Sequence, residues 1–262
     1  MTAGEVTAGC GRVGFFTDTS ICIGCKACEV ACKEWNGVPG EVPDVGLLGL
    51  SYDNTGALGA DDWRHVAFIE QGSGTDLRWL MMSDVCKHCT EAACLDVCPT
   101  GSLFRTEFGT VVVQQDICNG CGYCIPACPF GVIDQRKVDG RAWKCTMCYD
   151  RLKGGMEPAC AKACPTDSIQ FGDLRELRAR AAERVKAVPG ATLYGASEDD
   201  GVGGAAAFFL LLDSPEVYGL PPDPVVTTRD LGAMWRSAGA AAAALAVGVV
   251  GAFLGSGLGR RR

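Results

Sequence analysis

Residues 118–130 read CNGCGYCIPACPF. The cysteines Cys118, Cys121, Cys124 and Cys128 follow the spacing C-x2-C-x2-C-x3-C, with a proline next, which is the [4Fe–4S] spacing of bacterial ferredoxins. Three thiolates two residues apart lie on one tight loop and can bind three irons of a cubane. The fourth lies about one helical turn further on, and the proline stiffens the chain as it leaves. This stretch therefore predicts a ferredoxin-like cluster module.

Three further groups of four cysteines repeat the pattern, the first with the same gaps and the other two with a longer middle gap. They are Cys22, Cys25, Cys28 and Cys32; Cys86, Cys89, Cys94 and Cys98; and Cys145, Cys148, Cys160 and Cys164. In ferredoxins with two clusters, the fourth cysteine of a motif binds the other motif's cluster, so motifs work in pairs. Four motifs therefore predict an α+β fold with two tandem ferredoxin-like modules and four [4Fe–4S] clusters.

The composition supports a folded chain that carries electrons. The 262 residues include 17 cysteines, 48% hydrophobic residues and a formal net charge of −7, which argues against disorder and against a nucleic-acid partner. Disulfides would suit a small secreted chain, and zinc ribbons need pairs of C-x2-C separated by long loops, so iron–sulfur is favoured over both. Four cysteines per cluster leave no open iron for a substrate, and no nucleophile or phosphate-binding motif is found, so no catalytic residue is expected.

Other chemically active residues lie beside the motifs. His88 and His65 could each be a ligand or a proton shuttle, but four cysteines already complete each site, so structural roles are favoured. Cys10 is interpreted as a spare thiol. Four lysines next to the ligands either raise the cluster potentials through their charge or are ordinary solvated side chains. They are Lys26, Lys33, Lys87 and Lys144.

The sequence divides into segments of different character. We expect an N-terminal segment, a four-cluster domain with an insertion, an amphipathic helix followed by an extended arm, and a C-terminal anchor. Their ranges are 1–17, 18–172 with the insertion at 38–85, 173–228, and 229–262. Within them, the patterns predict a loop at 38–62, small β-hairpins at 64–83 and 102–114, and a helix after the N-cap Asp173.

Residues 237–259 contain no charged side chain. As a helix they would be about 34 Å long, which is enough to cross a hydrocarbon core of about 30 Å. We therefore predict a single transmembrane helix in the lipid bilayer. The alternative is a buried helix rich in alanine and glycine. Arg260, Arg261 and Arg262 follow, which predicts a cytoplasmic C-terminus and a cluster domain on the outer face of the cell membrane. Residues 1–17 show no export signal, so the domain either crosses bound to a partner that carries one or has the inverted orientation.

The residues between the cysteines resemble a known family. Stretches 22–36, 118–130 and 144–151, and residues 218–221 ahead of a single C-terminal helix, are similar to the iron–sulfur (beta) subunit of membrane-bound formate dehydrogenases. The four-motif pattern alone is shared with subunits of polysulfide, dimethyl-sulfoxide and nitrite reductases and of hydrogenases. The Glu-Trp-Asn stretch at 34–36 and the C-terminal tail favour formate dehydrogenase.

The resemblance implies how the cysteines share clusters. The four sets are Cys22, Cys25, Cys28 and Cys164; Cys32, Cys145, Cys148 and Cys160; Cys86, Cys89, Cys94 and Cys128; and Cys98, Cys118, Cys121 and Cys124. It also implies two partners: a molybdopterin-containing catalytic (alpha) subunit, with molybdenum or tungsten, that oxidises formate, and a membrane cytochrome b-type (gamma) subunit that reduces quinone. This chain would relay electrons between them.

Overall fold

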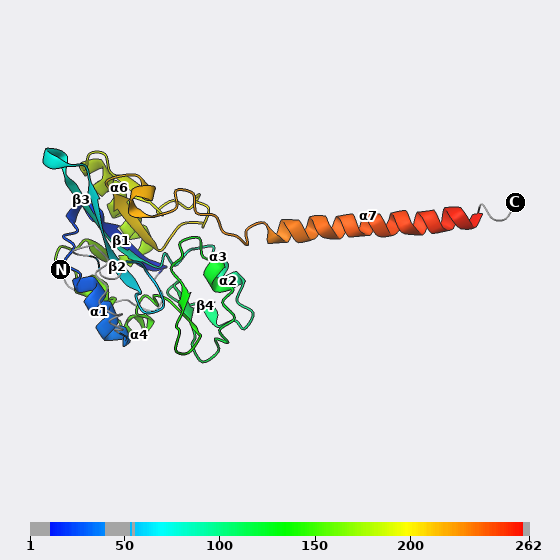
Figure 1. Cartoon of the computed structure of the whole chain (residues 1–262), viewed down its shortest axis with the longest axis horizontal. Helices are drawn as coiled ribbons and strands as arrows, with labels where there is room; N and C mark the ends of the chain where they lie inside the picture. The colour runs from blue at the N-terminus through cyan, green and yellow to red at the C-terminus, as the bar shows by residue number, and fades with distance from the viewer. Residues whose placement is uncertain (1–10, 40–52, 54–55, 259–262) are drawn as a thin grey trace. The chain divides into compact units, whose positions relative to one another are not determined.

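The computed structural model describes residues 11–39, 53 and 56–258. Cys10, Arg260, Arg261, Arg262 and much of the loop predicted at 38–62 lie outside the described residues. The chain forms two compact units, Met1–Val226 and Thr227–Arg262, and the first contains all four cysteine motifs (Figure 1). The second contains one long helix, α7.

A four-stranded sheet in the order β8-β1-β10-β9 supports the first unit. Its strands are β1 (Val13–Asp18), β8 (Ile169–Asp173), β9 (Thr192–Tyr194) and β10 (Ala207–Leu211). The two central strands, β1 and β10, run parallel, and every residue in both is buried. Parallel strands covered on both faces are expected to be continuously apolar, and β10 reads AFFLL.

This sheet corrects two expectations. Residues 1–17 were set apart from the cluster domain, yet β1 pairs with β8 and β10 at the centre of the sheet. Residues 173–228 were predicted to be a helix and an extended arm, whereas β9 and β10 lie within that range. The apolar run at 205–212 has no alternation because both faces of β10 are covered, so it lacks the period-two pattern of a half-exposed strand.

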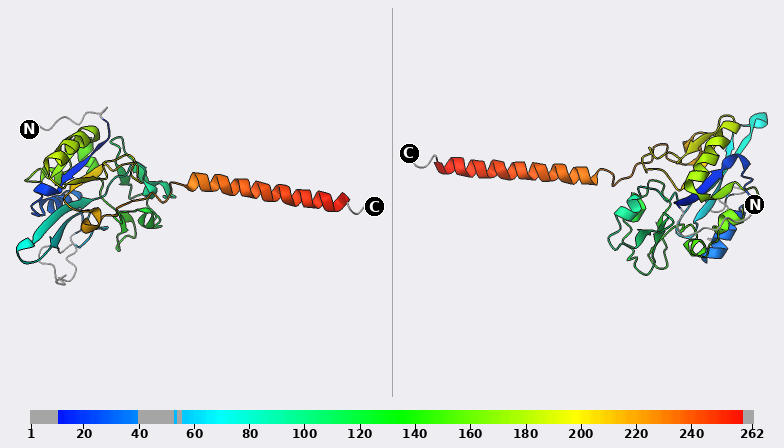
Figure 2. Two further views of the ribbon diagram at one scale, coloured as in Figure 1. Left: turned by 90° about the horizontal axis from the view of Figure 1, so that it is seen from above. Right: turned by 180° about the vertical axis from the view of Figure 1, so that it is seen from behind.

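Helix α6 (Leu174–Ala187) covers one face of this sheet (Figure 2). The Asp173 side chain accepts hydrogen bonds from the backbone amides of Arg175 and Glu176, which confirms the predicted N-cap. Leu174, Leu177 and Ala181 pack against Phe16 and Phe208 of the sheet, whose rings stack with centroids 5.4 Å apart. The predicted amphipathic helix therefore buries its apolar stripe on the sheet.

Three two-stranded hairpins accompany the cysteine loops. They are β2 (Arg64–Gln71) with β3 (Arg78–Val85), β4 (Leu103–Arg105) with β5 (Val111–Val113), and β6 (Asp134–Gln135) with β7 (Ala142–Trp143). The first two lie at the segments where the sequence predicted hairpins. In the second, Gly109 adopts the left-handed backbone (φ 75°) that its turn requires.

Short helices begin inside or just after the cysteine motifs. They are α1 (Ala27–Asn36), α2 (Ala93–Asp96), α3 (Cys124–Ala127), α4 (Tyr149–Lys153) and α5 (Ala159–Lys162). Helices α2 and α3 lie together with β4 in one part of the unit, as Figure 1 shows, while α1 and α5 pack on each other in the other part. Short 3-10 turns occur at Thr19–Ile21, Gly74–Asp76 and Pro215–Tyr218.

Helix α7 (Leu231–Leu258) is 28 residues long and starts before the predicted residue 237. Its segment Leu231–Phe253 has a mean hydropathy of 1.5 and is long and apolar enough to cross a membrane. The length and composition of α7 thus agree with the predicted transmembrane helix.

Candidate iron–sulfur centres

Each cysteine loop bends through the left-handed backbone region at the residue just before its second cysteine. These residues are Gly24 (φ 63°), His88 (φ 45°), Gly120 (φ 72°) and Met147 (φ 56°). Such turns direct successive backbone amides to the concave side of a loop, where they favour bound negative charge. At Gly24 a Cβ atom would lie 2.6 Å from the Phe68 ring, so this turn also requires glycine for space.

The cysteines of different motifs meet around four separate spaces. Three are cavities lined by four cysteines each, and in the fourth group the Cys32 thiol interacts electrostatically with three other cysteines. We name them site 1 (Cys22, Cys25, Cys28, Cys164), site 2 (Cys32, Cys145, Cys148, Cys160), site 3 (Cys86, Cys89, Cys94, Cys128) and site 4 (Cys98, Cys118, Cys121, Cys124). The structure thus brings the cysteines together in the groups that the resemblance implied; that they bind iron in these groups stays a prediction.

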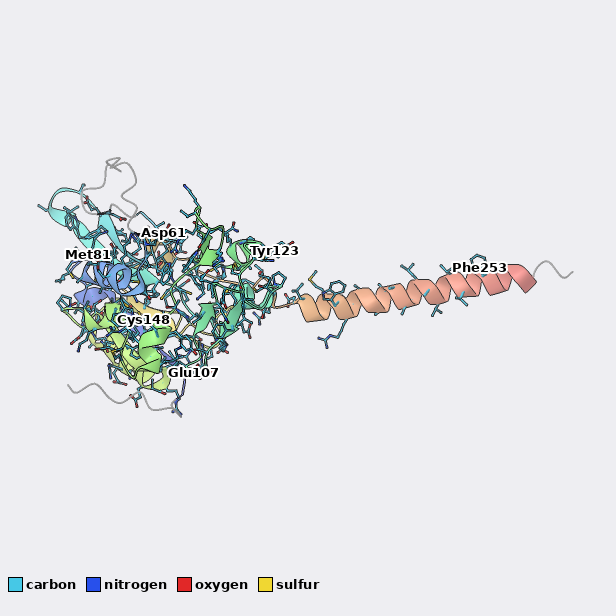
Figure 3. The ribbon with its side chains drawn as sticks, turned by 90° about the horizontal axis from the view of Figure 1, so that it is seen from below. Asp61, Met81, Glu107, Tyr123, Cys148 and Phe253 are labelled. Carbon is cyan, nitrogen blue, oxygen red and sulfur yellow. The ribbon has the colours of Figure 1, made fainter. Side chains whose placement is uncertain are left out.

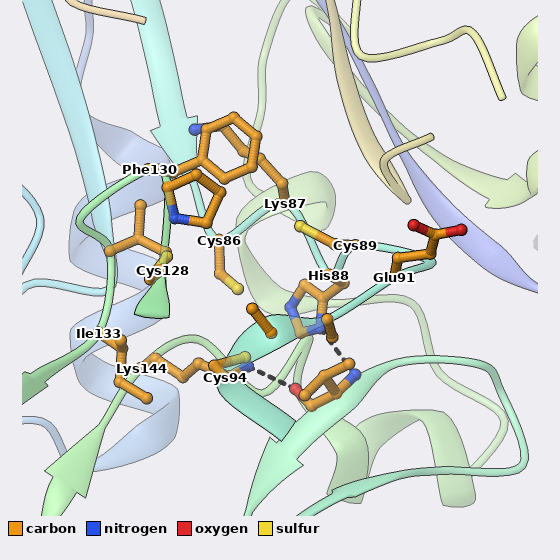
Figure 4. Close-up of a pocket in the computed structure, with 15 residues that line it drawn as sticks. Cys86, Lys87, His88, Cys89, Glu91, Cys94, Cys128, Phe130, Ile133 and Lys144 are labelled. Carbon is orange, nitrogen blue, oxygen red and sulfur yellow. Dashed lines mark hydrogen bonds between the residues drawn. The ribbon is translucent and has the colours of Figure 1, made fainter. Parts of the chain in front are cut away.

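The donor set of each site suits a polynuclear cluster. Within the described residues, no three His, Cys, Asp or Glu side chains converge closely enough to hold a single metal ion. The four cysteines of sites 1, 3 and 4 instead line larger cavities, as Figure 4 shows for site 3. Four cysteine sulfurs around one cavity are what a [4Fe–4S] cubane requires.

Burial makes these thiols hard to ionise without iron. Burial raises the pKa of Cys28 to about 11, with the Cys160 thiol adding to the rise, and burial together with the Cys86 thiol raises that of Cys145 to about 12. Without iron these two thiols are then protonated at neutral pH, so binding of iron to them must release protons and supply compensating positive charge.

Cys98 of site 4 differs from the other ligands. Burial again raises its pKa, but hydrogen bonds from the Ser102 hydroxyl and the Leu103 backbone outweigh burial and lower the pKa to about 7. Ser102 lies 3.3 Å from the Cys98 sulfur. Site 4 therefore offers a thiolate already stabilised for binding.

Asn36, in the Glu-Trp-Asn stretch at the end of α1, contacts two cysteines of site 2. Its Nδ2 donates to the sulfurs of Cys32 at 3.7 Å and Cys148 at 3.8 Å, two ligands of site 2. Trp35 lies on the surface, where Arg151 stacks over its ring at 4.2 Å. Asn36 thus supplies outer hydrogen bonds to two sulfurs, which are among the determinants of cluster potential.

The sites form a row, an order that the sequence did not reveal. Cys28 interacts electrostatically with Cys160, which joins site 1 to site 2. Cys145 interacts with Cys86, which joins site 2 to site 3. Cys94 interacts with Cys124, which joins site 3 to site 4. The packing agrees with these neighbours, because Cys28, Cys86, Cys145 and Cys160 belong to one buried cluster and Cys94, Cys98 and Cys124 to another. The order that these contacts give is 1-2-3-4.

Only the two ends of this row reach the surface openly. Cys25 of site 1 and Cys121 of site 4 are the exposed thiols among the described cysteines, whereas all four cysteines of site 2 are buried. Site 2 is therefore the most shielded of the four, and site 3 is partly exposed through Cys89, Cys94 and Cys128.

A buried cation lies at the joint between sites 1 and 2. Arg64 is 2% exposed, and its Nη1 donates to the Ser83 hydroxyl at 3.1 Å. Burial opposes its charge, but the thiols of Cys160 and Cys28 outweigh burial and raise its pKa further above the ordinary value. Arg64 therefore stays charged between two thiol groups. Sequence reasoning missed it because an arginine in a β-rich run gives no sign of burial.

Lys144 occupies the corresponding place between sites 2 and 3. It is 2% exposed, and its Nζ donates to the carbonyls of Val111 and Cys145. Burial lowers its pKa, but the thiols of Cys86, Cys94 and Cys145 outweigh burial and raise it. Lys144 is thus the predicted tuning lysine best placed to act on two clusters.

The other three candidate lysines pair with carboxylates. Lys33 lies 2.5 Å from Asp62, Lys26 lies 3.2 Å from Glu29, and Lys87 contacts Asp84. Among the residues that the structure describes, neither Arg64 nor Lys144 has an acidic ion-pair partner within 4.0 Å. The cysteine thiols are therefore the groups that favour their positive charge most strongly.

The two histidines have different surroundings. His65 lies 3.2 Å from Asp53 through Nε2, which supports a structural role in the insertion. His88 is buried and lines the site 3 cavity together with its four cysteines (Figure 4).

Comparison with known proteins identifies the family. Residues 21–102 and 77–174 each match a family described as a 4Fe-4S dicluster domain. The chain is 41% identical to the iron–sulfur subunit of the nitrate-inducible formate dehydrogenase of Escherichia coli, over 93% of this chain and 83% of that protein. It is 41% identical to the formate dehydrogenase iron–sulfur subunit of Haemophilus influenzae, over 88% and 75%. The B subunit of the anaerobic dimethyl sulfoxide reductase of Escherichia coli is 36% identical over 68% of this chain and 82% of its own length.

Two dicluster domains hold four [4Fe–4S] clusters, and sixteen cysteines in four motifs are present to bind them. Ferredoxin-type domains carry electrons and contain no active site. The chain belongs to the family of iron–sulfur subunits of formate dehydrogenases.

Proposed function

We propose that this chain is the electron-transfer subunit of a membrane-bound formate dehydrogenase. Four [4Fe–4S] clusters at sites 1 to 4 would relay electrons from a molybdopterin-containing catalytic subunit to a cytochrome b-type membrane subunit. The observation that carries the proposal is the row of four thiol groups with an exposed cysteine at each end, Cys25 and Cys121. Such a row suits a relay better than a single storage or structural cluster.

The residues of this chain would bind the clusters, shield them from water and offset their negative charge. When bound, each cluster supplies one-electron oxidation and reduction, and its net charge becomes more negative on reduction. Arg64 and Lys144 place positive charge at two successive joints, which stabilises the reduced forms. The full burial of the site 2 cysteines keeps water away from the middle of the row.

Apolar side chains beside the exposed ends favour docking of partner subunits there. Ile23 is 58% exposed next to Cys22 at site 1. Tyr123 is 62% exposed between Cys121 and Cys124 at site 4 (Figure 3). Exposed apolar and aromatic side chains are enriched where proteins meet, so each end of the row has a surface suited to one partner.

The alternative function is the same electron relay in a polysulfide, dimethyl-sulfoxide or nitrite reductase or in a hydrogenase. The share of the chain that aligns with each relative favours formate dehydrogenase. The formate dehydrogenase subunit of Escherichia coli matches 93% of this chain, whereas the dimethyl sulfoxide reductase subunit matches 68%. About a quarter of the chain therefore has a counterpart only in the first of these two relatives.

Anaerobic purification of the chain with its native partners tests this function. We expect about sixteen iron atoms per chain, since four clusters hold four irons each. Formate added to the oxidised complex should reduce the clusters, as followed by electron paramagnetic resonance (EPR), with dimethyl sulfoxide and hydrogen as control reagents. Reduction by hydrogen but not by formate would support the alternative. Stoichiometric zinc without iron would end the redox interpretation.

We also propose that α7 spans the cell membrane with the cluster domain on the outer face. The apolar length of Leu231–Phe253 and the following Arg260, Arg261 and Arg262 support this orientation. In right-side-out spheroplasts, added protease should cleave the cluster domain, and in inverted vesicles the domain should be protected. The opposite pattern contradicts the orientation. Truncation after Val226 should release the chain from the membrane fraction in either orientation.

A further inference from the structure

We propose that His88 donates a hydrogen bond from Nε2 to the cluster of site 3 and thereby raises the reduction potential of that cluster. The proposal rests on the relay proposed above and adds a residue that sets one of its potentials. It makes site 3 different from the other three sites by the chemistry of a single side chain.

The position of His88 brings its ring into the site 3 cavity. It lies between Cys86 and Cys89, is 1% exposed, and lines the cavity with all four cysteines of the site. Its left-handed backbone (φ 45°) is uncommon for a residue other than glycine, and persists only where surrounding contacts hold it. One such contact is Arg12, whose Nη2 donates to the His88 carbonyl.

One hydrogen bond fixes the state of the ring. The Val111 backbone amide donates to His88 Nδ1 at 3.1 Å, so Nδ1 is the acceptor and carries no proton. An imidazole that accepts at Nδ1 is neutral and has its proton on Nε2. The ring therefore presents an N–H donor from its opposite edge.

That donor is unpaired within the part of the chain that the structure describes. His88 Nε2 is buried without a hydrogen-bond acceptor among the described residues. Figure 4 shows the edge of the ring away from Val111 directed into the space between Cys86 and Cys94. A buried unpaired donor is costly, and the acceptors that a cluster would place there are its thiolate and sulfide sulfurs. A bound cluster thus satisfies a donor that the chain leaves unpaired.

The other three sites lack this donor at the corresponding position. The residue just before the second cysteine is Gly24 in the first motif, Gly120 in the third and Met147 in the fourth, all with positive φ. None of these side chains can donate a hydrogen bond. A donor to a cluster sulfur stabilises the more negative reduced state, so the N–H of His88 should raise the potential of the site 3 cluster.

Two variants in the assembled complex separate the donor from the rest of the ring. His88→Asn keeps an acceptor for the Val111 amide, tolerates the left-handed backbone, and places no donor where Nε2 lies. His88→Gln keeps an amide N–H near the position of Nε2. EPR-monitored redox titration should show one cluster shifted to lower potential in His88→Asn and closer to wild type in His88→Gln. Met147→Leu, at the matching position of the fourth motif, is the control and should shift none.

A direct spectroscopic readout checks the contact itself. In the complex labelled with ¹⁵N-histidine, pulsed EPR should detect a nitrogen and an exchangeable proton coupled to one cluster, and both couplings should vanish in His88→Asn. The couplings should also vanish with the site 3 cluster in Cys94→Ala. Four clusters with unchanged potentials and no histidine coupling would overturn the role of His88 and leave the relay standing. Absence of clusters from the wild-type complex would instead overturn the relay.

Discussion

In the Arg64→Leu variant, we expect the clusters of sites 1 and 2 to titrate at lower potentials and the loaded chain to lose about 3–5 kcal/mol of unfolding free energy. Arg64 is buried between thiols of both sites, including Cys28 and Cys160. Removing it leaves two negatively charged clusters facing each other without the cation between them, in a region of low dielectric. Reduction adds further negative charge to each cluster, so the reduced clusters lose more stabilisation than the oxidised ones.

The shape of the Arg64 side chain predicts the result of a milder change. Nη1 donates to both the hydroxyl and the carbonyl of Ser83, while the guanidinium stacks on the Phe15 ring at 4.9 Å. Arg64→Lys keeps the positive charge but loses the planar guanidinium and its stacking. Its cluster potentials and its unfolding free energy should therefore lie between those of wild type and of Arg64→Leu.

Anaerobic urea unfolding and EPR-monitored redox titration measure the two effects of Arg64 separately. Arg175→Leu is the matched control, because its side chain is 87% exposed, and it should change the unfolding free energy by no more than about 0.5 kcal/mol. If Arg64→Leu retains all its iron and the potentials at sites 1 and 2 equal those of wild type, the charge of Arg64 does not act on the clusters.

Features encoded by local spacing were predictable from the sequence, and features created by distant contacts were not. The N-cap at Asp173 depends on residues a few positions apart, and the structure has it where it was expected. The pairing of Phe15 with Ala207 in parallel strands joins residues far apart in the chain, and no local pattern encodes such a pair.

The same distinction applies to the charged residues around the sites. Adjacency to a cysteine marked four lysines as candidates, but only the fold reveals that Lys33 is paired with Asp62 whereas Lys144 is buried between two sites. Arg64 is distant in sequence from most of the cysteines it influences, so adjacency could not find it. The sequence favours a structural role for His88, because only the fold reveals that the Val111 amide of β5 donates to Nδ1 and that Nε2 is unpaired among the described residues.

Replacing Cys98 with alanine should remove the cluster of site 4, although Cys98 belongs to the motif whose other three cysteines line site 3. Cys98 lines the same cavity as Cys118, Cys121 and Cys124, and Cys128 lines that of site 3. This crossing follows from the ferredoxin rule that a motif's fourth cysteine binds the partner cluster. Iron content should fall from about sixteen to about twelve atoms per chain.

A double variant distinguishes this crossed sharing from sharing within a motif. If Cys98 and Cys121 bind the same cluster, adding Cys121→Ala to Cys98→Ala removes no further cluster, and iron stays at about twelve atoms per chain. If Cys98 instead shared a cluster with Cys86, Cys89 and Cys94, the double variant would lose two clusters and retain about eight iron atoms. Cys89→Ala with Cys121→Ala is the control that should reach about eight in either case, because these two cysteines belong to different clusters under both schemes. The measurement is made on chains that still hold the iron of sites 1 and 2. A value near eight iron atoms for Cys98→Ala with Cys121→Ala would then reject the crossed arrangement, in which sites 3 and 4 each take a cysteine from the other's motif.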